Sequence, residues 1–241
     1  LERRGDLALG PAHRHAHHLA ALSQPVAQKN MNLAQVCLSG RPDAEALVFV
    51  PAGGPCTRLT TEELSGRVAA LAERIEQVSA PGDTVLIRLQ HGVDFAAAFL
   101  AVIAAGRISV PLSPMLTAAE VQWIAHNSKA SCSIADHTLS FPEISIRRIE
   151  AGQTPDSSRI RFAETRPESP AFLVYTSGTS GTPRGVLHAH RNIFGRRPMV
   201  EGWTGLCSTD RVFHSGMLNW TYTLGAGLMD PLREGACAVL A

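Results

Sequence analysis

The sequence lacks both a charge imbalance and an apolar run long enough to cross a membrane. Lys and Arg number 22 and Asp and Glu number 21 among the 241 residues, which leaves a net charge of +1. This balance gives no reason to expect a nucleic acid or an anionic membrane as a partner. No apolar run approaches the roughly 20 residues that a membrane-spanning helix needs. We therefore expect no nucleic-acid partner and no membrane span.

The sequence also lacks any regular cysteine pattern. Its five cysteines are scattered and contain no Cys-x-x-Cys pair, so a zinc site is not expected. An odd number of cysteines without a disulfide framework is typical of reduced thiols in the cytosol. None of them has a sequence context typical of a nucleophile. We therefore expect a cytoplasmic protein.

Residues 1–30 differ from the rest of the chain. His13, His15, His17 and His18 crowd together among Ala, Arg and Pro. The tract suits either metal binding or a disordered extension, and we favour the extension. A signal peptide is not expected, because His and Gln interrupt the apolar portions. Since the chain begins with Leu, we expect the natural start at Met31 and a domain over 31–241.

From Met31 onward the sequence alternates between strand and helix patterns. Strands are expected at 46–50, 85–87, 108–110, 131–135 and 171–174, and helices at 93–105 and in the segments that follow two Thr-x-x-Glu capping boxes at 60–63 and 117–120. Asn32 is expected to cap a short helix. Such alternation is typical of βαβ units. The sequence therefore predicts an α/β fold with a mostly parallel sheet flanked by helices, and a polar surface connection at 147–170.

A polar loop at 175–185 follows the strand expected at 171–174. Its sequence, Tyr-Thr-Ser-Gly-Thr-Ser-Gly-Thr-Pro-Arg-Gly, combines hydroxyl side chains, three glycines and one cation. Glycines let a backbone approach a ligand closely, and successive N–H groups in such a turn can form an anion site. The hydroxyl groups and Arg184 add further donors. The pattern predicts a loop that wraps a polyphosphate.

Three other interpretations of this loop fit less well. A solvent-exposed Ser/Gly linker has no need of a hydrophobic strand directly before it. A Walker A loop needs a Gly-Lys pair, which the chain lacks, and its two glycines lie further apart than Gly178 and Gly181. A nucleophile elbow needs Gly-x-Ser-x-Gly, and residues 178–181 are one residue short of it.

The loop resembles the signature of the adenylate-forming (AMP-binding) superfamily, Tyr/Phe-Thr-Ser-Gly-Thr-Thr/Ser-Gly-x-Pro-Lys-Gly. The chain matches it from Tyr175 to Gly181 and again at Pro183 and Gly185. It departs at Arg184, where the family usually has Lys, and Arg keeps the charge with a different donor geometry. Weaker matches at 81–85, 95–106 and 110–120 stand in the family's order. Together they identify the chain as similar to the N-terminal portion of the acyl- and aryl-CoA synthetase branch.

The resemblance implies a two-step reaction that uses ATP, Mg²⁺ and coenzyme A. A small carboxylic acid, fatty or aromatic, attacks the α-phosphorus of ATP, and the thiol of coenzyme A then displaces AMP from the acyl-adenylate. The residues implied to hold the phosphates are Thr176, Ser177, Gly178, Thr179, Ser180, Gly181, Thr182 and Arg184. Thr179 is also expected near the metal ion. His214 and Trp220 are expected near the acyl group.

Two segments after the loop carry further expectations. The His-rich segment 188–192 is expected at a helix N-terminus beside the phosphates, rather than as a metal pair. Segments 210–214 and 219–228 resemble the strand and the helix that line the family's carboxylate pocket. Alternatively, Trp220 and Tyr222 are simply core aromatics. Gly225-Ala226-Gly227 does not fit a dinucleotide fingerprint, because the third glycine is absent.

Family members continue well beyond the point that corresponds to Ala241. The remaining part normally carries the adenine pocket, the acidic motif for magnesium, the ribose-binding Asp and a C-terminal domain with a catalytic Lys. None of those motifs occurs here, so we expect the fragment to be inactive alone. A nucleotide- or phosphate-binding remnant and a truncated interaction protein remain the alternatives, and a homodimer is left open.

Overall fold

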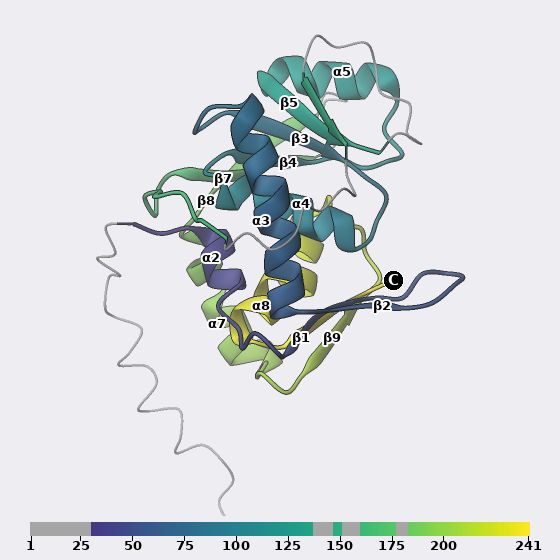
Figure 1. The fold of residues 1–241 in the computed structure, drawn as a ribbon, viewed down its shortest axis with the longest axis vertical. Coiled ribbons are helices and arrows are strands. Elements are labelled where there is room, and N and C mark those ends of the chain that lie inside the picture. The colour runs from purple at the N-terminus through teal and green to yellow at the C-terminus, as the bar shows by residue number, and fades with distance from the viewer. Residues whose placement is uncertain (1–29, 137–146, 151–159, 177–182) are drawn as a thin grey trace, which may run out of the picture.

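Two β-sheets organise the part of the chain that the computed structural model describes, residues 30–136, 147–150, 160–176 and 183–241. The six-stranded sheet has the strand order β6-β5-β3-β4-β7-β8, and the four-stranded sheet has the order β2-β1-β10-β9. Figure 1 shows the first sheet toward the top of the molecule and the second toward the bottom. The arrangement confirms the expected α/β class with helices flanking the sheets.

The six-stranded sheet is parallel apart from one edge. Its strands are β3 (Thr84–Arg88), β4 (Ile108–Pro111), β5 (Ala130–Ala135), β6 (Arg147–Glu150), β7 (Pro170–Thr176) and β8 (Arg184–Ala189). All neighbours run parallel except β7 and β8, which form an antiparallel hairpin. The carboxyl ends of β3, β4, β5 and β7 therefore lie along the same edge of the sheet.

The four-stranded sheet joins both ends of the described chain. It consists of β1 (Glu45–Phe49), β2 (Thr57–Thr60), β9 (Arg211–His214) and β10 (Cys237–Leu240). The late strand β10 is inserted between β1 and β9 and runs parallel to both. Strand β2 returns antiparallel to β1, so the two form a hairpin.

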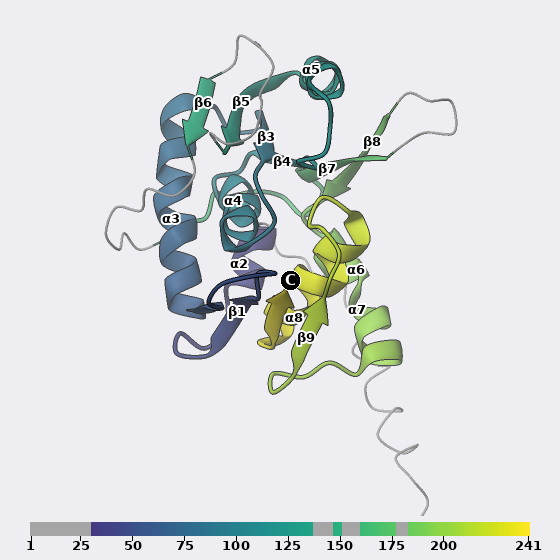
Figure 2. The ribbon, with the colours of Figure 1, turned by 90° about the vertical axis from the view of Figure 1, so that its right-hand side faces the viewer.

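The helices pack around and between the sheets. They are α2 (Leu33–Cys37), α3 (Thr61–Val78), α4 (Val93–Ala104), α5 (Ala118–Asn127), α6 (Asn192–Gly195), α7 (Arg197–Met199), α8 (Asp230–Glu234) and two π-helical segments, η3 (Val200–Thr204) and η4 (Thr223–Met229). Helix α4 is buried from Phe95 to Ala104 and contacts strands of both sheets, and Figure 2 shows it in the middle of the molecule. It is the central element of the main hydrophobic core.

The helix starts follow the local sequence. Thr60 with Glu63 and Thr117 with Glu120 form complete capping boxes at α3 and α5, in which each side chain bonds a backbone N–H of the other residue. Asn32 caps α2 by accepting from the N–H of Ala34. These three predictions are confirmed.

Two sequence predictions about local structure are wrong. The connection expected at 147–170 contains β6, which pairs in parallel with the edge of β5. Residues 184–189 form a strand rather than leading into a helix, because they pair along the length of β7. The helix expected at segment 188–192 begins at its last residue, Asn192, while residues 188 and 189 belong to β8.

Candidate phosphate-loop and acyl-side site

The β7–β8 hairpin fixes the two ends of the predicted phosphate loop. Thr176 ends β7 and lies opposite Arg184, the first residue of β8. The Thr176 hydroxyl donates to the Arg184 carbonyl at 3.4 Å, and the Arg184 residue is exposed. The other predicted loop residues, Ser177, Gly178, Thr179, Ser180, Gly181 and Thr182, lie outside the described residues. The register of β7 and β8 therefore fixes the positions of the residues on either side of the loop.

Tyr175, the first residue of the motif, anchors the end of β7 to α5. Its hydroxyl donates to Asn127 Oδ1 at 2.6 Å, and its ring lies edge-on to Trp123 with centroids 6.0 Å apart. Burial raises the pKa of the Tyr175 hydroxyl. The phenol therefore stays protonated at neutral pH and acts as a hydrogen-bond donor at the base of the loop.

Gly185, the last residue of the motif, is required by packing across the hairpin. A Cβ atom there would lie 2.9 Å from Leu173 Cδ1 and 3.3 Å from Tyr175 Cζ. Because Gly185 stands directly opposite Tyr175, its missing side chain makes room for the tyrosine ring. The role of this glycine in the structure is therefore close packing.

The two histidines that follow the loop are held inside the fold. The His188 ring stacks on Phe172 with centroids 4.4 Å apart. His190 is fully buried, and its Nδ1 accepts the N–H of Leu33 at 3.0 Å. This bond ties α2 to the end of β8, and burial lowers the pKa of His190 to about 4. His190 is therefore a neutral structural residue.

We expect the stability of the chain to fall as the pH drops from 7 to 5 because of His190. Its folded-state pKa of about 4 lies below the roughly 6.5 of an accessible imidazole. The unfolded chain therefore binds a proton that the folded chain excludes, so the stabilisation is complete above pH 6.5 and is lost as the pH falls toward 4. The expected loss between pH 7 and pH 5 is on the order of 2 kcal/mol, measurable by urea unfolding.

Asparagine substitutions separate this effect from general titration. His190→Asn keeps an acceptor near the Leu33 N–H but removes the proton-binding group, so its stability should depend less steeply on pH. The control is His126→Asn, because His126 is exposed at the end of α5. If the free energy of unfolding of His190→Asn depends on pH as steeply as that of wild type, His190 is not the titrating group.

His214, one of the two residues expected near the acyl group, ends β9 and faces the η4 helix. Its Nδ1 accepts the N–H of Gly216 at 3.0 Å, and its ring centroid lies 5.5 Å from that of Tyr222. A Cβ atom at Gly227 would lie only 2.9 Å from His214 Cβ. The strand predicted at 210–214 is confirmed, and one glycine of the Gly-Ala-Gly segment makes room for His214.

The aromatic residues at the start of the next helix face outward. Trp220 is 51% exposed and Tyr222 is 55% exposed, so neither is a core aromatic. A continuous helical segment runs from Thr221 through η4 into α8. As the crossover between β9 and β10, it begins at the carboxyl edge of the four-stranded sheet. Trp220 therefore stands at the same edge of this sheet as His214.

A buried ion pair that the sequence did not indicate fixes this helix. Arg196 bonds both carboxylate oxygens of Asp230, with Nε–Oδ1 at 2.9 Å and Nη2–Oδ2 at 2.7 Å. The Asp230 side chain is only 4% exposed. A Cβ atom at Gly225 would overlap the Arg196 guanidinium. Gly225 thus leaves room for the Arg196 side chain. In the sequence, this contact is indicated only by the two glycines at 225 and 227.

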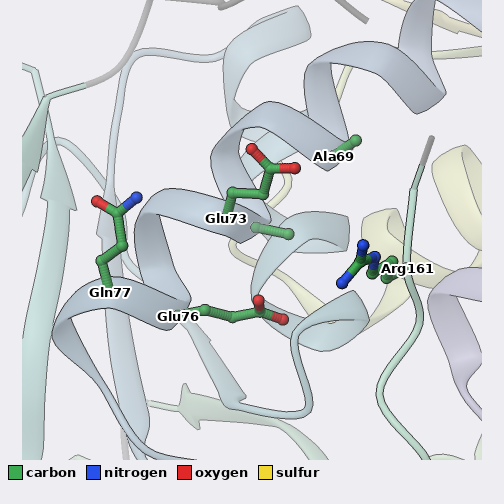
Figure 3. A pocket seen from close by; sticks show the side chains of 6 residues that line it. Ala69, Glu73, Glu76, Gln77 and Arg161 are labelled. Carbon is green, nitrogen blue, oxygen red and sulfur yellow. The ribbon is translucent and has the colours of Figure 1, made fainter. Parts of the chain in front are cut away.

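Several hollows lie on the described part of the molecule, and two of them are considered for the site. One of about 470 Å³ lies between α7, η3, β9 and η4, with Trp203, Phe213 and Tyr222 among its lining residues. Another of about 420 Å³ lies beside α3, where Glu73, Glu76 and Arg161 line it (Figure 3). The first is lined by Phe213, Tyr222 and Ala226, which belong to the two segments expected to line the carboxylate pocket, but not by His214 or Trp220. The second is lined by no residue predicted for the site. Within the described ranges, no three or more His, Cys, Asp or Glu side chains form a metal-binding group.

No helix in the described part of the chain is long and apolar enough to cross a membrane. The metal contact expected for Thr179 falls on a residue outside that part. The structure thus brings Thr176 and Arg184 together, and it places His214 and Trp220 at the carboxyl edge of the four-stranded sheet.

Comparisons with known proteins give one consistent match. A family model described as "AMP-binding enzyme" matches residues 34–241. Benzoate–CoA ligase of Thauera aromatica is 28% identical over 206 residues, which cover 75% of this chain and 38% of that protein. Anthranilate–CoA ligase of Pseudomonas aeruginosa is 27% identical over 227 residues, which cover 87% of this chain and 43% of that protein.

Solved structures support the fold. A fatty acid AMP ligase from Legionella pneumophila superimposes with a TM-score of 0.76 at 23% identity, over 87% of this chain and 39% of that one. At this identity the likeness concerns the fold alone. The chain spans less than half the length of each of these three proteins.

Proposed function

The chain belongs to the AMP-binding enzyme family, and from this premise we propose that it forms the N-terminal part of an ATP-dependent acyl- or aryl-CoA synthetase. The observation that carries the proposal is the match over residues 34–241, which includes the β7–β8 hairpin. The hairpin brings the hydroxyl of Thr176 and the cation of Arg184 to the two ends of one loop. Those groups fit a polyphosphate.

In this proposal the loop binds the β- and γ-phosphates of ATP, which leave as pyrophosphate. A carboxylate oxygen of the acid attacks the α-phosphorus, the bond to the β-phosphate oxygen breaks, and pyrophosphate departs. Residues 176–182 and Arg184 would bind the β- and γ-phosphates and stabilise the charge that develops on pyrophosphate. When bound, Mg²⁺ supplies further neutralisation of that charge, and the Thr179 hydroxyl would lie beside it. Because the residue at 184 is arginine, it can bond two phosphate oxygens at once.

The second step uses the thiol of coenzyme A. The thiol releases its proton to solvent, its sulfur bonds to the acyl carbon, and the bond from that carbon to the phosphate oxygen breaks. AMP leaves with this oxygen, which gives a thioester. In the proposal, His214 and Trp220 lie along the acyl group. The exposed Trp220 and Tyr222 suit an aromatic or medium-sized acid. The names of the benzoate and anthranilate ligases support an aryl acid.

Binding and turnover separate this proposal from a phosphate-binding remnant. We expect residues 1–241 to bind MgATP in calorimetry but to release no AMP when an acid and coenzyme A are added. Catalysis needs groups on both sides of the reacting centre, and the chain spans less than half of its relatives. Fusion to the remaining part of a related ligase is then expected to restore AMP release. Binding that never leads to AMP release, even in the fusion, would favour the remnant.

A further inference from the structure

The end of the β7–β8 hairpin that carries Thr176 and Arg184 has little support from the rest of the fold. Strand β8 is the outermost strand of the six-stranded sheet, and β7 is its one partner among the described strands (Figure 2). Residues 184–187 are all exposed. A segment with few buried contacts opens readily. The positions of the two phosphate-loop residues therefore depend on what fixes the end of β7.

A tyrosine ring lies across this end of the hairpin. Tyr175 and Gly185 stand directly opposite each other, and the next pair is Thr176 with Arg184. A Cβ atom at Gly185 would lie 3.3 Å from Cζ and 3.4 Å from Cε1 of the Tyr175 ring, so the ring lies over the glycine backbone. The place of this ring thus affects both strands, directly beside the two phosphate-loop residues.

Helix α5 holds the Tyr175 ring through two side chains. The Tyr175 hydroxyl donates to Asn127 Oδ1 at 2.6 Å. The Trp123 and Tyr175 rings meet edge-on, with centroids 6.0 Å apart and planes at 86°, which is a favourable arrangement for an aromatic pair. Trp123 and Asn127 are four residues apart on α5 and so lie on one face of the helix. Together they fix both the tip and the edge of the tyrosine ring.

These two α5 residues contribute little to the packing of the helix itself. Trp123 and Asn127 are both exposed. The side chains that bury α5 against the sheet are instead Val121, Ile124 and Ala125. Replacing Trp123 and Asn127 is therefore expected to leave α5 in place, so that an effect on binding can be told apart from an effect on folding.

We propose that Asn127 and Trp123 are positioning residues for the proposed phosphate site, and that they act through Tyr175. The Tyr175 ring, held across the hairpin, fixes how Thr176 and Arg184 face a polyphosphate. Groups that are already in their binding positions bind more tightly, because less ordering is needed when the ligand arrives. The inference rests on the proposed function and identifies α5 as an element that sets the affinity for phosphate.

The test measures the binding of magnesium tripolyphosphate to the 241-residue chain by calorimetry. In the double variant Trp123→Leu with Asn127→Leu, we expect binding to weaken about tenfold, because an aromatic contact and a hydrogen bond to Tyr175 are both lost. The matched control, Gln122→Leu with His126→Leu, moves both substitutions by one position along α5, to exposed side chains. It should bind tripolyphosphate like wild type.

Conservative substitutions separate positioning from folding. Trp123→Phe with Asn127→Asp keeps an aromatic ring and an acceptor oxygen, so its affinity should return to within about threefold of wild type. Titration at roughly 0.15 M salt screens the charge that the aspartate adds. A purely structural role would instead lower the free energy of unfolding of the double leucine variant and leave its affinity for tripolyphosphate unchanged.

A spectroscopic signal tests the same contact in the wild-type chain and does not need the leucine variant to fold. The indole ¹⁵N–¹H signal of Trp123, assigned from Trp123→Phe, should move when magnesium tripolyphosphate is added. If tripolyphosphate binds but this signal does not move, or if the folded leucine variant binds as tightly as wild type, the inference is wrong and the proposed function stands. If wild type does not bind tripolyphosphate, both the inference and the proposed phosphate site fail.

Discussion

Replacing Thr179 and Gly181 together by alanine is expected to weaken MgATP binding about 100-fold. The threonine would lose a hydroxyl bond to a charged phosphate, worth about 1.5–3 kcal/mol. The glycine would lose its access to backbone conformations that bring N–H groups close to the ligand, which costs about a further 1 kcal/mol. Calorimetric titration of wild type and variant at one salt concentration measures the difference.

A matched control uses a threonine and a glycine away from the loop. Gly53 lies in the β1–β2 turn, where an added Cβ atom would have nothing within 4 Å, and Thr209 is exposed before β9. The pair Gly53→Ala and Thr209→Ala should bind MgATP like wild type. If the folded loop variant binds MgATP as tightly as wild type, the loop does not bind the phosphates.

Replacing Asp230 by alanine is expected to lower the free energy of unfolding by about 3–5 kcal/mol, the largest stability effect that we expect for a single substitution. The change leaves the Arg196 guanidinium, whose side chain is 20% exposed, without its bidentate partner. Breaking a buried pair by removing one charge is costly for this reason. Because the pair joins α6 and α7 to the helix that follows Trp220, this helix should loosen first. Urea unfolding monitored by tryptophan fluorescence measures the loss.

Two further variants identify the uncompensated charge as the cause. Arg196→Met combined with Asp230→Leu removes both charges, so it should be more stable than Asp230→Ala alone. Asp43→Ala breaks the exposed pair with Arg41, whose side chains are 71% and 80% exposed, and should cost less than about 1 kcal/mol. A loss below about 1 kcal/mol in Asp230→Ala would contradict a structural role for the buried pair.

The sequence predicted those parts of the fold that depend on near neighbours. A capping box acts within four residues, so α3 and α5 began where Thr60 and Thr117 indicated. The strands β3, β4 and β5 followed from short apolar runs between turns. The loop motif was recognisable because its glycines and hydroxyl groups are contiguous in sequence.

Long-range pairing decided what the sequence did not reveal. Residues 184–189 form a strand because β7 lies beside them, and no local pattern specifies that partner. The insertion of β10 between β1 and β9 joins residues from opposite ends of the described chain, as in Leu47 opposite Ala238, and splits the expected sheet into two.

Long-range contacts also limited what the sequence could predict about the candidate site. Arg196 and Asp230 are 34 positions apart, and an isolated arginine or aspartate gives no sign of burial. The His91 ring likewise lies edge-on to Phe49, which belongs to a distant segment of the chain. Contacts of this kind are set by packing between elements, so a single sequence carries little trace of them.

The most direct test of the central claim is a competition between inorganic tripolyphosphate and ATP for the 241-residue chain in the presence of Mg²⁺. If the loop from Thr176 to Arg184 binds the β- and γ-phosphates, one tripolyphosphate should displace one ATP, with an affinity comparable to that of ATP. Adenosine should not displace ATP. Displacement by adenosine but not by tripolyphosphate, or no binding of either phosphate compound, would contradict the account.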